Sequence, residues 1–482
     1  MDEDIDRFAH TFSQFMEAMI MRGQMGSNTL TPLGETVQDF LGVELASVDP
    51  VTENYPEHQV VDVDYAARQL VERNGGTVVG VTGAERMHID SFQDFLMQSH
   101  WNYRVGPVSY ARVATGPTTD RRVIMIGISM LQLDGVPLVA MHRAANKRFG
   151  RDEYALEMLC PEPAVVDRYL TLITELMTEH SVLRGQVISF QADHFEHHDP
   201  GSTLRFLERP DVTADQVILP DGVLERVSRH VVGIGARREA LAAAGQHLKR
   251  GVLLYGPPGT GKTHLVRHLL SQTPETTAVL LSGRTLGLLN DATKLARANQ
   301  PAIIVLEDCD LVAEERGGDT NAALFETLEA LDGLDGDADI AFILTTNRPD
   351  LLERALVERP GRVDLAVQID KPDTDARRQL LALYAGDLAL SSDALAEAAD
   401  RTDGATASFA KELIRRCVLQ AADVGETPGD DHLLAALEEM TSESETLTRT
   451  LLGGGSYTFD GEHDGEQDDD DDEALEPGTS AW

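Results

Sequence analysis

The chain has 482 residues, too many for one ordinary hydrophobic core, so two or three folded units are expected. It contains 81 acidic and 41 basic residues, which gives a formal net charge of -40 at pH 7. Such a surface repels phosphate backbones, which argues against DNA or RNA as a bulk partner, although a ring can carry a basic pore on an acidic body.

The cysteines and the hydropathy pattern bear on the compartment. Cys160, Cys309 and Cys417 are odd in number and widely spaced, which favours reduced thiols over a disulfide framework or a zinc site. The acidic first residues do not resemble a signal peptide, and no apolar run reaches the roughly 18 residues of a membrane helix. We expect a cytoplasmic protein with no membrane partner.

Residues 1–205 are predicted to form an α+β domain that binds a substrate or partner. Residues 5–25 place apolar side chains at helical spacing, which is typical of a helix with one buried face. Short β-rich runs and then a helical stretch follow, at Thr77–Val81, Arg122–Leu133, Val136–His142 and Ala164–Ser181. No catalytic signature occurs in this part of the sequence.

A polar cluster near the end of this domain contains good metal ligands. Its members are Asp193, His194, Glu196, His197, His198 and Asp199. Because Pro200 and Gly201 follow directly, a polar linker is the favoured interpretation and a zinc site is the alternative.

Residues 206–220, which include two prolines, are predicted to be a linker, and residues 221–371 an α/β domain. Five short apolar runs alternate with helical stretches there, at Val252–Tyr255, Ala278–Leu281, Ile303–Leu306, Ile340–Thr345 and Leu365–Ile369. Such alternation predicts a parallel sheet with helices on both faces. A helix from Thr374 to Tyr384 then opens a small helical lid domain over residues 372–445. The acidic residues 446–482 are predicted to form a disordered tail.

A glycine-rich loop between a predicted strand and a predicted helix carries the clearest chemistry. Its residues match the P-loop (Walker A) pattern in full: Gly256, Pro257, Pro258, Gly259, Thr260, Gly261, Lys262 and Thr263. The glycines let backbone amides turn towards the β- and γ-phosphates of a nucleotide, Lys262 neutralises phosphate charge, and Thr263 is a ligand for Mg²⁺. The sequence therefore predicts a site for ATP and Mg²⁺.

Two acids follow the third apolar run, where a buried parallel strand would end. Glu307 and Asp308 come directly after Ile303–Leu306. One carboxylate is needed at this position to hold the hydrated metal, and another to orient and deprotonate the attacking water. Both residues are therefore predicted to be catalytic.

With these motifs the sequence resembles the AAA family, in its branch of proteasomal, membrane-protease and remodelling ATPases. The resemblance covers roughly residues 221–420 and includes further segments in the family's order. They are similar to the intersubunit signalling motif, the sensor strand end, the arginine-finger segment and the first turn of the lid helix: Leu331–Leu334, Thr345–Pro349, Arg359–Asp364 and Thr406–Leu413.

The resemblance implies an ATP-hydrolysing enzyme. Asn347 would position the attacking water, and Arg359 and Arg362 would reach the nucleotide bound by the next subunit, so the active species would be a homo-oligomeric ring, a hexamer. ATP cycles would drive remodelling, unfolding or disassembly of a protein substrate. An ATP-switched scaffold or chaperone with slow hydrolysis is the alternative, and a DNA translocase a more distant one.

Two departures from the family matter. The acids stand as Glu307 then Asp308, where the family usually has Asp then Glu; the mitochondrial inner-membrane AAA translocase family is similar in having the reversed order. Gapless alignment makes Glu307 the metal ligand and Asp308 the base, so we expect slow hydrolysis, and we expect restoring the usual order to retain or increase activity. The pore segment Arg284–Leu288 has no aromatic residue, which leaves the threading of polypeptide open.

Overall fold

The computed structural model describes residues 30–83, 91–97, 102–146, 151–190, 204–309, 338–348 and 363–442. The expected helix at residues 5–25, the polar cluster at 193–199 and the tail at 446–482 lie outside these ranges. The chain divides into two compact units, residues 1–257 with 261–370, and residues 258–260 with 371–482. Each unit is described by itself below, and the first contains two sheets.

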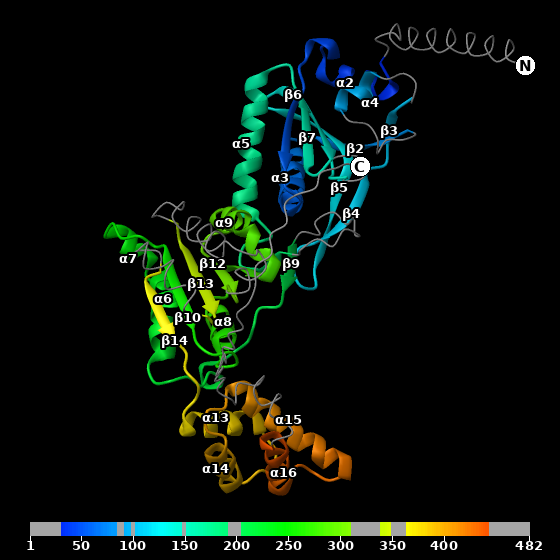
Figure 1. Ribbon diagram of the computed structural model, residues 1–482. Coiled ribbons are helices and arrows are strands. Elements are labelled where there is room, and N and C mark those ends of the chain that lie inside the picture. Colours follow the sequence, from blue (N-terminus) through cyan, green and yellow to red (C-terminus); the bar gives the residue numbers. More distant parts are fainter. Residues whose placement is uncertain are drawn as a thin grey trace, which may run out of the picture. The chain divides into compact units, whose positions relative to one another are not determined.

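The first sheet is antiparallel, seven-stranded, and lies in the N-terminal part of the chain (Figure 1). Its strands are β1 (Val51–Tyr55), β2 (Thr77–Thr82), β3 (Arg104–Gly106), β4 (Ser109–Ala114), β5 (Asp120–Leu133), β6 (Val136–Arg143) and β7 (Tyr154–Leu159). The long β5–β6 hairpin closes at Asp134 and Gly135, whose φ angles are 55° and 82°. Positive φ at both central residues is typical of the tight turns that match the right-handed twist of strands.

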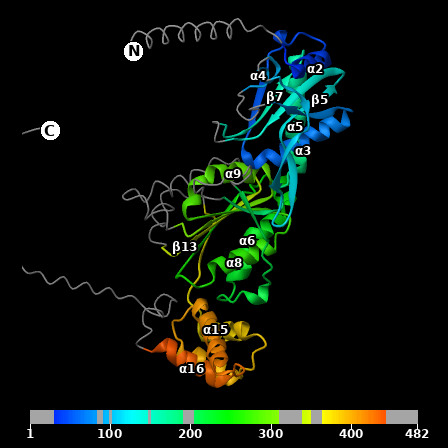
Figure 2. The ribbon, with the colours of Figure 1, turned by 90° about the vertical axis from the view of Figure 1, so that its right-hand side faces the viewer.

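Helices cover both faces of the first sheet, because successive strand residues point to opposite faces. Leu138 and Ala140 of β6 pack in the core with α3 (Val60–Arg73) and α5 (Pro163–His180), which lie side by side (Figure 2). Val139 and Met141 of the same strand pack in the core with α2 (Pro32–Leu41) and α4 (Phe92–Met97). The β-rich runs and the helix expected in this region are present as β2, β5, β6 and α5.

The second sheet also has seven strands, in the order β14-β10-β13-β12-β11-β8-β9. Its strands are β8 (Val187–Phe190), β9 (Leu204–Leu207), β10 (Arg250–Tyr255), β11 (Thr277–Ser282), β12 (Ala302–Glu307), β13 (Ile340–Thr346) and β14 (Leu365–Gln368). All pairings are parallel except that of β9 with β8. The five predicted strands are thus confirmed, and so is the mixed α/β class with a parallel sheet.

The central strands of this sheet are buried on both faces, which accounts for their unbroken apolar runs. On one face Val305 and Ile343 pack in a core with α6 (Val223–Ala236) and α8 (Lys262–Ser271). On the other face Ile304 and Phe342 pack in a core with α9 (Leu289–Ala298). Helices therefore lie on both faces of the second sheet. The short helix α7 (Arg238–Ala243) follows α6.

The boundary expected at residue 205 does not coincide with the division between the two sheets. β8 pairs with β11, from Val187 opposite Ala278 to Ser189 opposite Leu280, and β9 pairs with β8. Both strands therefore belong to the second sheet. The stretch expected to be a linker is also partly packed: Val217 lies in the core beside α6 and α8, and Arg209 donates hydrogen bonds to three backbone carbonyls, of Gly185, Leu270 and Thr276.

The second unit holds four helices among its described residues: α13 (Thr374–Ala385), α14 (Ser392–Arg401), α15 (Ala407–Val424) and α16 (Asp430–Thr441). Asp373 caps α13 by accepting a hydrogen bond from the amide of Ala376. Thr406 caps α15 in the same way, and Gly425, with a φ of 74°, ends it. No helix in the described part of the chain is long and apolar enough to span a bilayer.

Candidate nucleotide site

The predicted P-loop joins the end of β10 to the start of α8. Gly256, Gly259 and Gly261 have φ angles of 145°, 74° and 107°, which side chains rarely tolerate. A Cβ atom at Gly256 would lie 2.2 Å from the carbonyl oxygen of Ile369. The three glycines are therefore required by the backbone path, and the loop delivers the chain to the N-terminus of α8, where the helix dipole favours an anion.

Lys262 is the first residue of α8 and is only 6% exposed. Its ammonium group donates hydrogen bonds to the carbonyls of Gly256 and Pro257, both at 2.8 Å. A buried ammonium held by the loop itself places a positive charge where the phosphates of a nucleotide would bind. The residues present thus fit a nucleoside triphosphate, and Lys262 is the side chain that would neutralise the charge of its phosphates.

Glu307, at the end of β12, faces the threonine that follows the P-loop lysine. The Thr263 hydroxyl makes a side-chain hydrogen bond with the Glu307 carboxylate. Burial raises the pKa of Glu307, and this hydrogen bond opposes the rise. A hydroxyl beside a carboxylate fits Mg²⁺, which commonly takes few protein ligands and completes its shell with phosphate oxygens and water.

This ligand set differs from an all-protein metal cage. Among the described residues, no three or more His, Cys, Asp or Glu side chains are grouped as metal ligands. A Mg²⁺ ion shared with a nucleotide does not need such a group. Thr263 and Glu307 are therefore the residues that would hold it.

Asp308 points to a different partner from that of its neighbour. The Asn347 side-chain amide donates a hydrogen bond to the Asp308 carboxylate, at 3.3 Å between Nδ2 and Oδ1. Both residues follow adjacent parallel strands, β12 and β13, so the carboxyl ends of these strands bring them together. The two neighbouring acids thus make different contacts, Glu307 with Thr263 and Asp308 with Asn347.

Some predicted site residues lie outside the part of the chain that the structure describes. Arg359 and Arg362 lie outside the described residues, as does the segment Leu331–Leu334. The pore segment Arg284–Leu288 lies within a short 3₁₀ helix, Gly283–Leu288, directly after β11.

Sequence reasoning overlooked two contacts beside the loop. The imidazole of His264 in α8 hydrogen-bonds the carbonyl of Gln216, at 3.0 Å from Nε2, and a Cβ at Gly261 would lie 3.6 Å from the Leu219 side chain. The stretch expected to be a linker therefore lines the start of α8. The prolines of this segment predict a linker, and no pattern in its sequence predicts contacts with α8.

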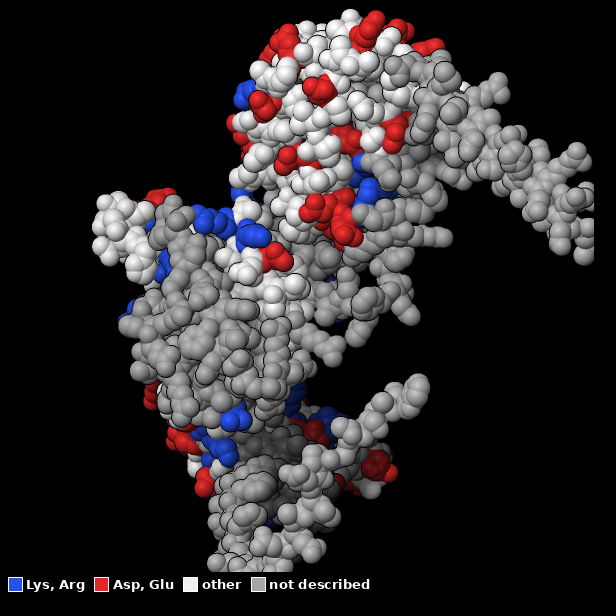
Figure 3. Space-filling view, turned by 45° about the horizontal axis from the view of Figure 1, so that its top comes forward, with Lys and Arg blue, Asp and Glu red and all other residues white. Residues whose placement is uncertain are grey.

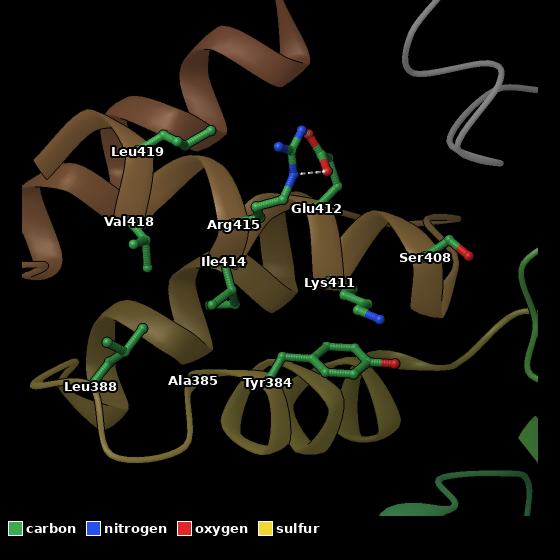
Figure 4. A pocket seen from close by; sticks show the side chains of 10 residues that line it. All are labelled: Tyr384, Ala385, Leu388, Ser408, Lys411, Glu412, Ile414, Arg415, Val418 and Leu419. Atoms are coloured by element: carbon green, nitrogen blue, oxygen red, sulfur yellow. Dashed lines mark hydrogen bonds and ion pairs between the residues drawn. The ribbon is translucent and has the colours of Figure 1, made fainter. Parts of the chain in front are cut away.

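The second unit contains a pocket of about 670 Å³ between α13 and α15 (Figure 4). Leu388, Ile414 and Val418 supply an apolar end, and Tyr384 and Lys411 lie towards the other end. It is lined by none of the P-loop residues or strand-end acids. One lining residue, Ser408, nevertheless donates its backbone amide to the P-loop carbonyl of Gly259 at 3.3 Å.

Comparison with known proteins agrees with this geometry. Residues 252–371 match the family described as "ATPase family associated with various cellular activities (AAA)". Proteasome-activating nucleotidase 2 of Haloferax volcanii is 31% identical over 277 residues, which are 53% of this chain and 66% of that protein. Proteasome-activating nucleotidase of Methanothermobacter thermautotrophicus is 33% identical over 226 residues, 43% of this chain and 54% of that protein.

A relative with a different name is similar to about the same extent. ATP-dependent zinc metalloprotease FtsH 1 of Thermomicrobium roseum is 30% identical over 260 residues, 50% of this chain and 40% of that protein. The chain thus spans less than two thirds of the length of each of these three relatives.

The parallel sheet, the P-loop and the acids at the strand ends define a P-loop nucleotide-binding protein. The family match and the relatives make this class more specific: the chain carries an AAA ATPase domain, as its motifs predicted.

Proposed function

We propose that this protein hydrolyses ATP in an oligomeric ring, a homo-hexamer, and uses the cycle to remodel, unfold or disassemble protein substrates. The observation that carries the proposal is that the two acids at the end of β12 make separate contacts, Glu307 with Thr263 and Asp308 with Asn347, which suits the first to a metal and the second to a water. The names of the relatives, proteasome-activating nucleotidases and a metalloprotease, support a protein as the substrate class.

In the proposed reaction the residues of this chain bind, orient and move one proton. Thr263 and Glu307 would hold Mg²⁺, which would supply positive charge to the phosphates. Asp308, oriented by Asn347, accepts a proton from the attacking water. The water oxygen then bonds to the γ-phosphorus, and the bond to the bridging oxygen breaks to give ADP and phosphate.

Substituting the two acids separately tests the site. Asp308→Asn should keep ATP bound but lower turnover by about 100-fold or more, because the general base is lost. Glu307→Gln should weaken Mg²⁺-dependent ATP binding as well. Calorimetry and phosphate-release assays measure the two effects, and Asp291→Asn on the exposed surface of α9 is a control for the loss of one charge. If Asp308→Asn turns over normally while Glu307→Gln binds ATP but is inert, the two roles are reversed.

The ring rests on the resemblance of Arg359–Asp364 to an arginine-finger segment. Arg359→Ala and Arg362→Ala should leave ATP binding intact and remove turnover, because their target is bound by the next subunit. Mixing either variant with Lys262→Ala should restore part of the activity. No recovery at any mixing ratio would argue against fingers that act on the next subunit. ATP should also promote ring closure, because the γ-phosphate adds a contact between neighbours, and equal masses in ATP and ADP by light scattering would argue against that closure.

A second candidate function is an ATP-switched scaffold with slow hydrolysis. It is favoured by the short Asp308 side chain at the base position and by the absence of an aromatic residue in Arg284–Leu288. Steady turnover stimulated by an unfolded protein such as casein supports the remodelling motor, whereas one turnover per binding event supports the scaffold. DNA-stimulated turnover would instead indicate a translocase.

The proposed location and partners follow from charge and thiol chemistry. Asp and Glu side chains spread over the visible surface of the N-terminal domain in Figure 3, in keeping with the net charge of -40. Such a surface disfavours nucleic acid as a bulk partner. All three cysteines are free, which supports a reducing compartment, the cytoplasm. We assign substrate selection to the N-terminal domain.

A further inference from the structure

Asp308 has a backbone conformation that few side chains adopt. Its φ is 49°, in the left-handed region, directly after Glu307 ends β12. A non-glycine residue there is strained and persists only where its surroundings impose the conformation. Asp is among the few residues enriched in this region, because its short polar side chain tolerates it.

Thr345 of β13 supplies the contacts that impose this conformation. Its hydroxyl accepts a hydrogen bond from the Asp308 amide at 3.1 Å, and its carbonyl accepts one from the Cys309 amide at 3.0 Å. The regular register between β12 and β13 ends at Leu306 opposite Leu344. Thr345 therefore supplies the hydrogen bonds beyond the point where the regular backbone pairing of β12 and β13 ends. Thr345 lies in a central strand and is only 1% exposed.

The turn determines where the Asp308 carboxylate lies. Held by Thr345 at its amide, Asp308 directs its side chain to Asn347, which comes two residues after Thr345 and directly follows β13. The neighbouring Thr346 has a different role, because its hydroxyl accepts a hydrogen bond from the Arg348 amide at its own strand end. The end of β13 and the residue that follows it thus fix both the backbone and the carboxylate of Asp308.

We propose that Thr345 is a positioning residue for hydrolysis, whose hydroxyl fixes the left-handed turn that aims the Asp308 carboxylate. This inference rests on the proposed function of Asp308 as the base. It also gives a reason for the order of the two acids, since the second position must adopt a left-handed backbone and Asp does so more readily than Glu. The double change Glu307→Asp, Asp308→Glu is therefore expected to lower turnover, contrary to the expectation from the sequence.

Removing only the hydroxyl tests the proposal. Thr345→Val keeps the shape of the side chain and should lower kcat by about 10-fold to 100-fold, as small misplacements of catalytic groups do, with ATP affinity within about 2-fold of wild type. Thr345→Ser keeps the hydroxyl and should restore turnover. Thr345→Ala should repeat the loss if the Val variant folds poorly.

Thr277→Val is a matched control in the same sheet, at the amino end of β11. Thr277 is also a buried β-strand threonine whose hydroxyl accepts a backbone amide, that of Gly185 at 3.0 Å. Its loss should affect stability but not kcat. If Thr345→Val turns over like wild type, or if both variants lose turnover in proportion to their melting temperatures, Thr345 has no positioning role.

Two further measurements separate this inference from the proposed function. Hydrogen exchange of the Asp308 amide without nucleotide should become faster in Thr345→Val but not in Thr345→Ser, and unchanged exchange would contradict the contact itself. In an Asp308→Asn background, Thr345→Val should lower turnover no further, because both act through one group. A wild-type protein without ATPase activity would overturn the proposed function, while the exchange result would still report on the turn.

Discussion

The two sheets of the first unit handle polar side chains in opposite ways. In the first sheet, Ser129, His142 and Tyr154 form a chain of two 2.7 Å hydrogen bonds, from the serine oxygen to one imidazole nitrogen and from the other nitrogen to the tyrosine oxygen. All three are fully or almost fully buried, and burial lowers the pKa of His142 to about 3. The histidine therefore stays neutral, sealed from any substrate.

In the second sheet, the polar side chains lie at the carboxyl ends of strands. Glu307, Asp308 and Asn347 are only partly buried, and they stand beside a loop built for phosphate. A serine, a histidine and a tyrosine are reactive types, yet their place inside a core makes them structural. The comparison teaches that the place of a polar side chain, at the carboxyl end of a strand or inside a core, distinguishes a reactive group from a structural one better than its residue type does.

The largest expected effect is a loss of ATP binding, and it comes from a change beside the second sheet. Lys262→Ala should weaken ATP binding by about 100-fold or more, because it removes a buried charge that would contact phosphate. Calorimetry measures the loss, and Lys294→Ala on the exposed surface of α9 is the control. Undiminished binding by the Lys262 variant would remove the basis of the assignment.

A large stability effect is expected from the first sheet. Arg143 and Glu157 form an ion pair inside it, and Glu157 also accepts a hydrogen bond from the Phe92 amide at 2.7 Å. Glu157→Gln removes the negative charge of a buried ion pair and should cost about 3–5 kcal/mol in the free energy of unfolding. Urea denaturation checks this against Asp120→Asn, which breaks the exposed pair with Arg112 and should cost at most about 1 kcal/mol. Equal losses would mean that burial does not govern these pairs.

A pH-dependent effect is expected where the two sheets are linked. Asp62 of α3 accepts a hydrogen bond from the Val182 amide, ahead of β8, and burial raises its pKa from 3.8 to about 6. Since the folded state holds this proton more tightly, the stabilisation is complete below about pH 4 and is lost as pH rises through 6. It amounts to at most about 3 kcal/mol.

Replacing Asp62 with Asn removes this titration. The melting temperature of wild type minus that of Asp62→Asn should therefore fall between pH 4 and pH 7. The same difference measured for Asp39→Asn, at an exposed position of α2, is the control. A difference that stays constant over this range would contradict the raised pKa.

The smallest effect is expected from the buried hydrogen-bond chain. Ser129→Ala removes one partner of a neutral imidazole and should cost about 1–2 kcal/mol of stability, with kcat and ATP affinity unchanged. Thermal unfolding and phosphate release measure the two. Ser47→Ala, whose hydroxyl is exposed, should change stability by less than about 0.5 kcal/mol. A loss of turnover in Ser129→Ala at constant stability would give the first sheet a role in catalysis.

The sequence predicted the second sheet better than the first for a physical reason. Buried parallel strands such as β12 and β13 are continuous apolar runs, and the P-loop needs specific residues at fixed spacing, so both can be recognised without a structure. The pairing of β8 with β11 was not predicted, because β8 is short and its partner lies far along the chain. The role of Thr345 depends on the φ angle of Asp308, which the apolar pattern of β13 does not encode.

The pairing of β8 with β11 has a consequence for how this protein can be divided or recombined. A fragment that begins at residue 205 would lack β8 and expose the backbone of Ala278–Leu280 as a bare edge, a template for aggregation. Only residues 181–186 separate α5 from β8, and Asp62 binds this short connection. The N-terminal domain is therefore not an exchangeable cassette: any transfer of it between proteins must cut after β9 and carry an edge of the nucleotide-binding sheet along.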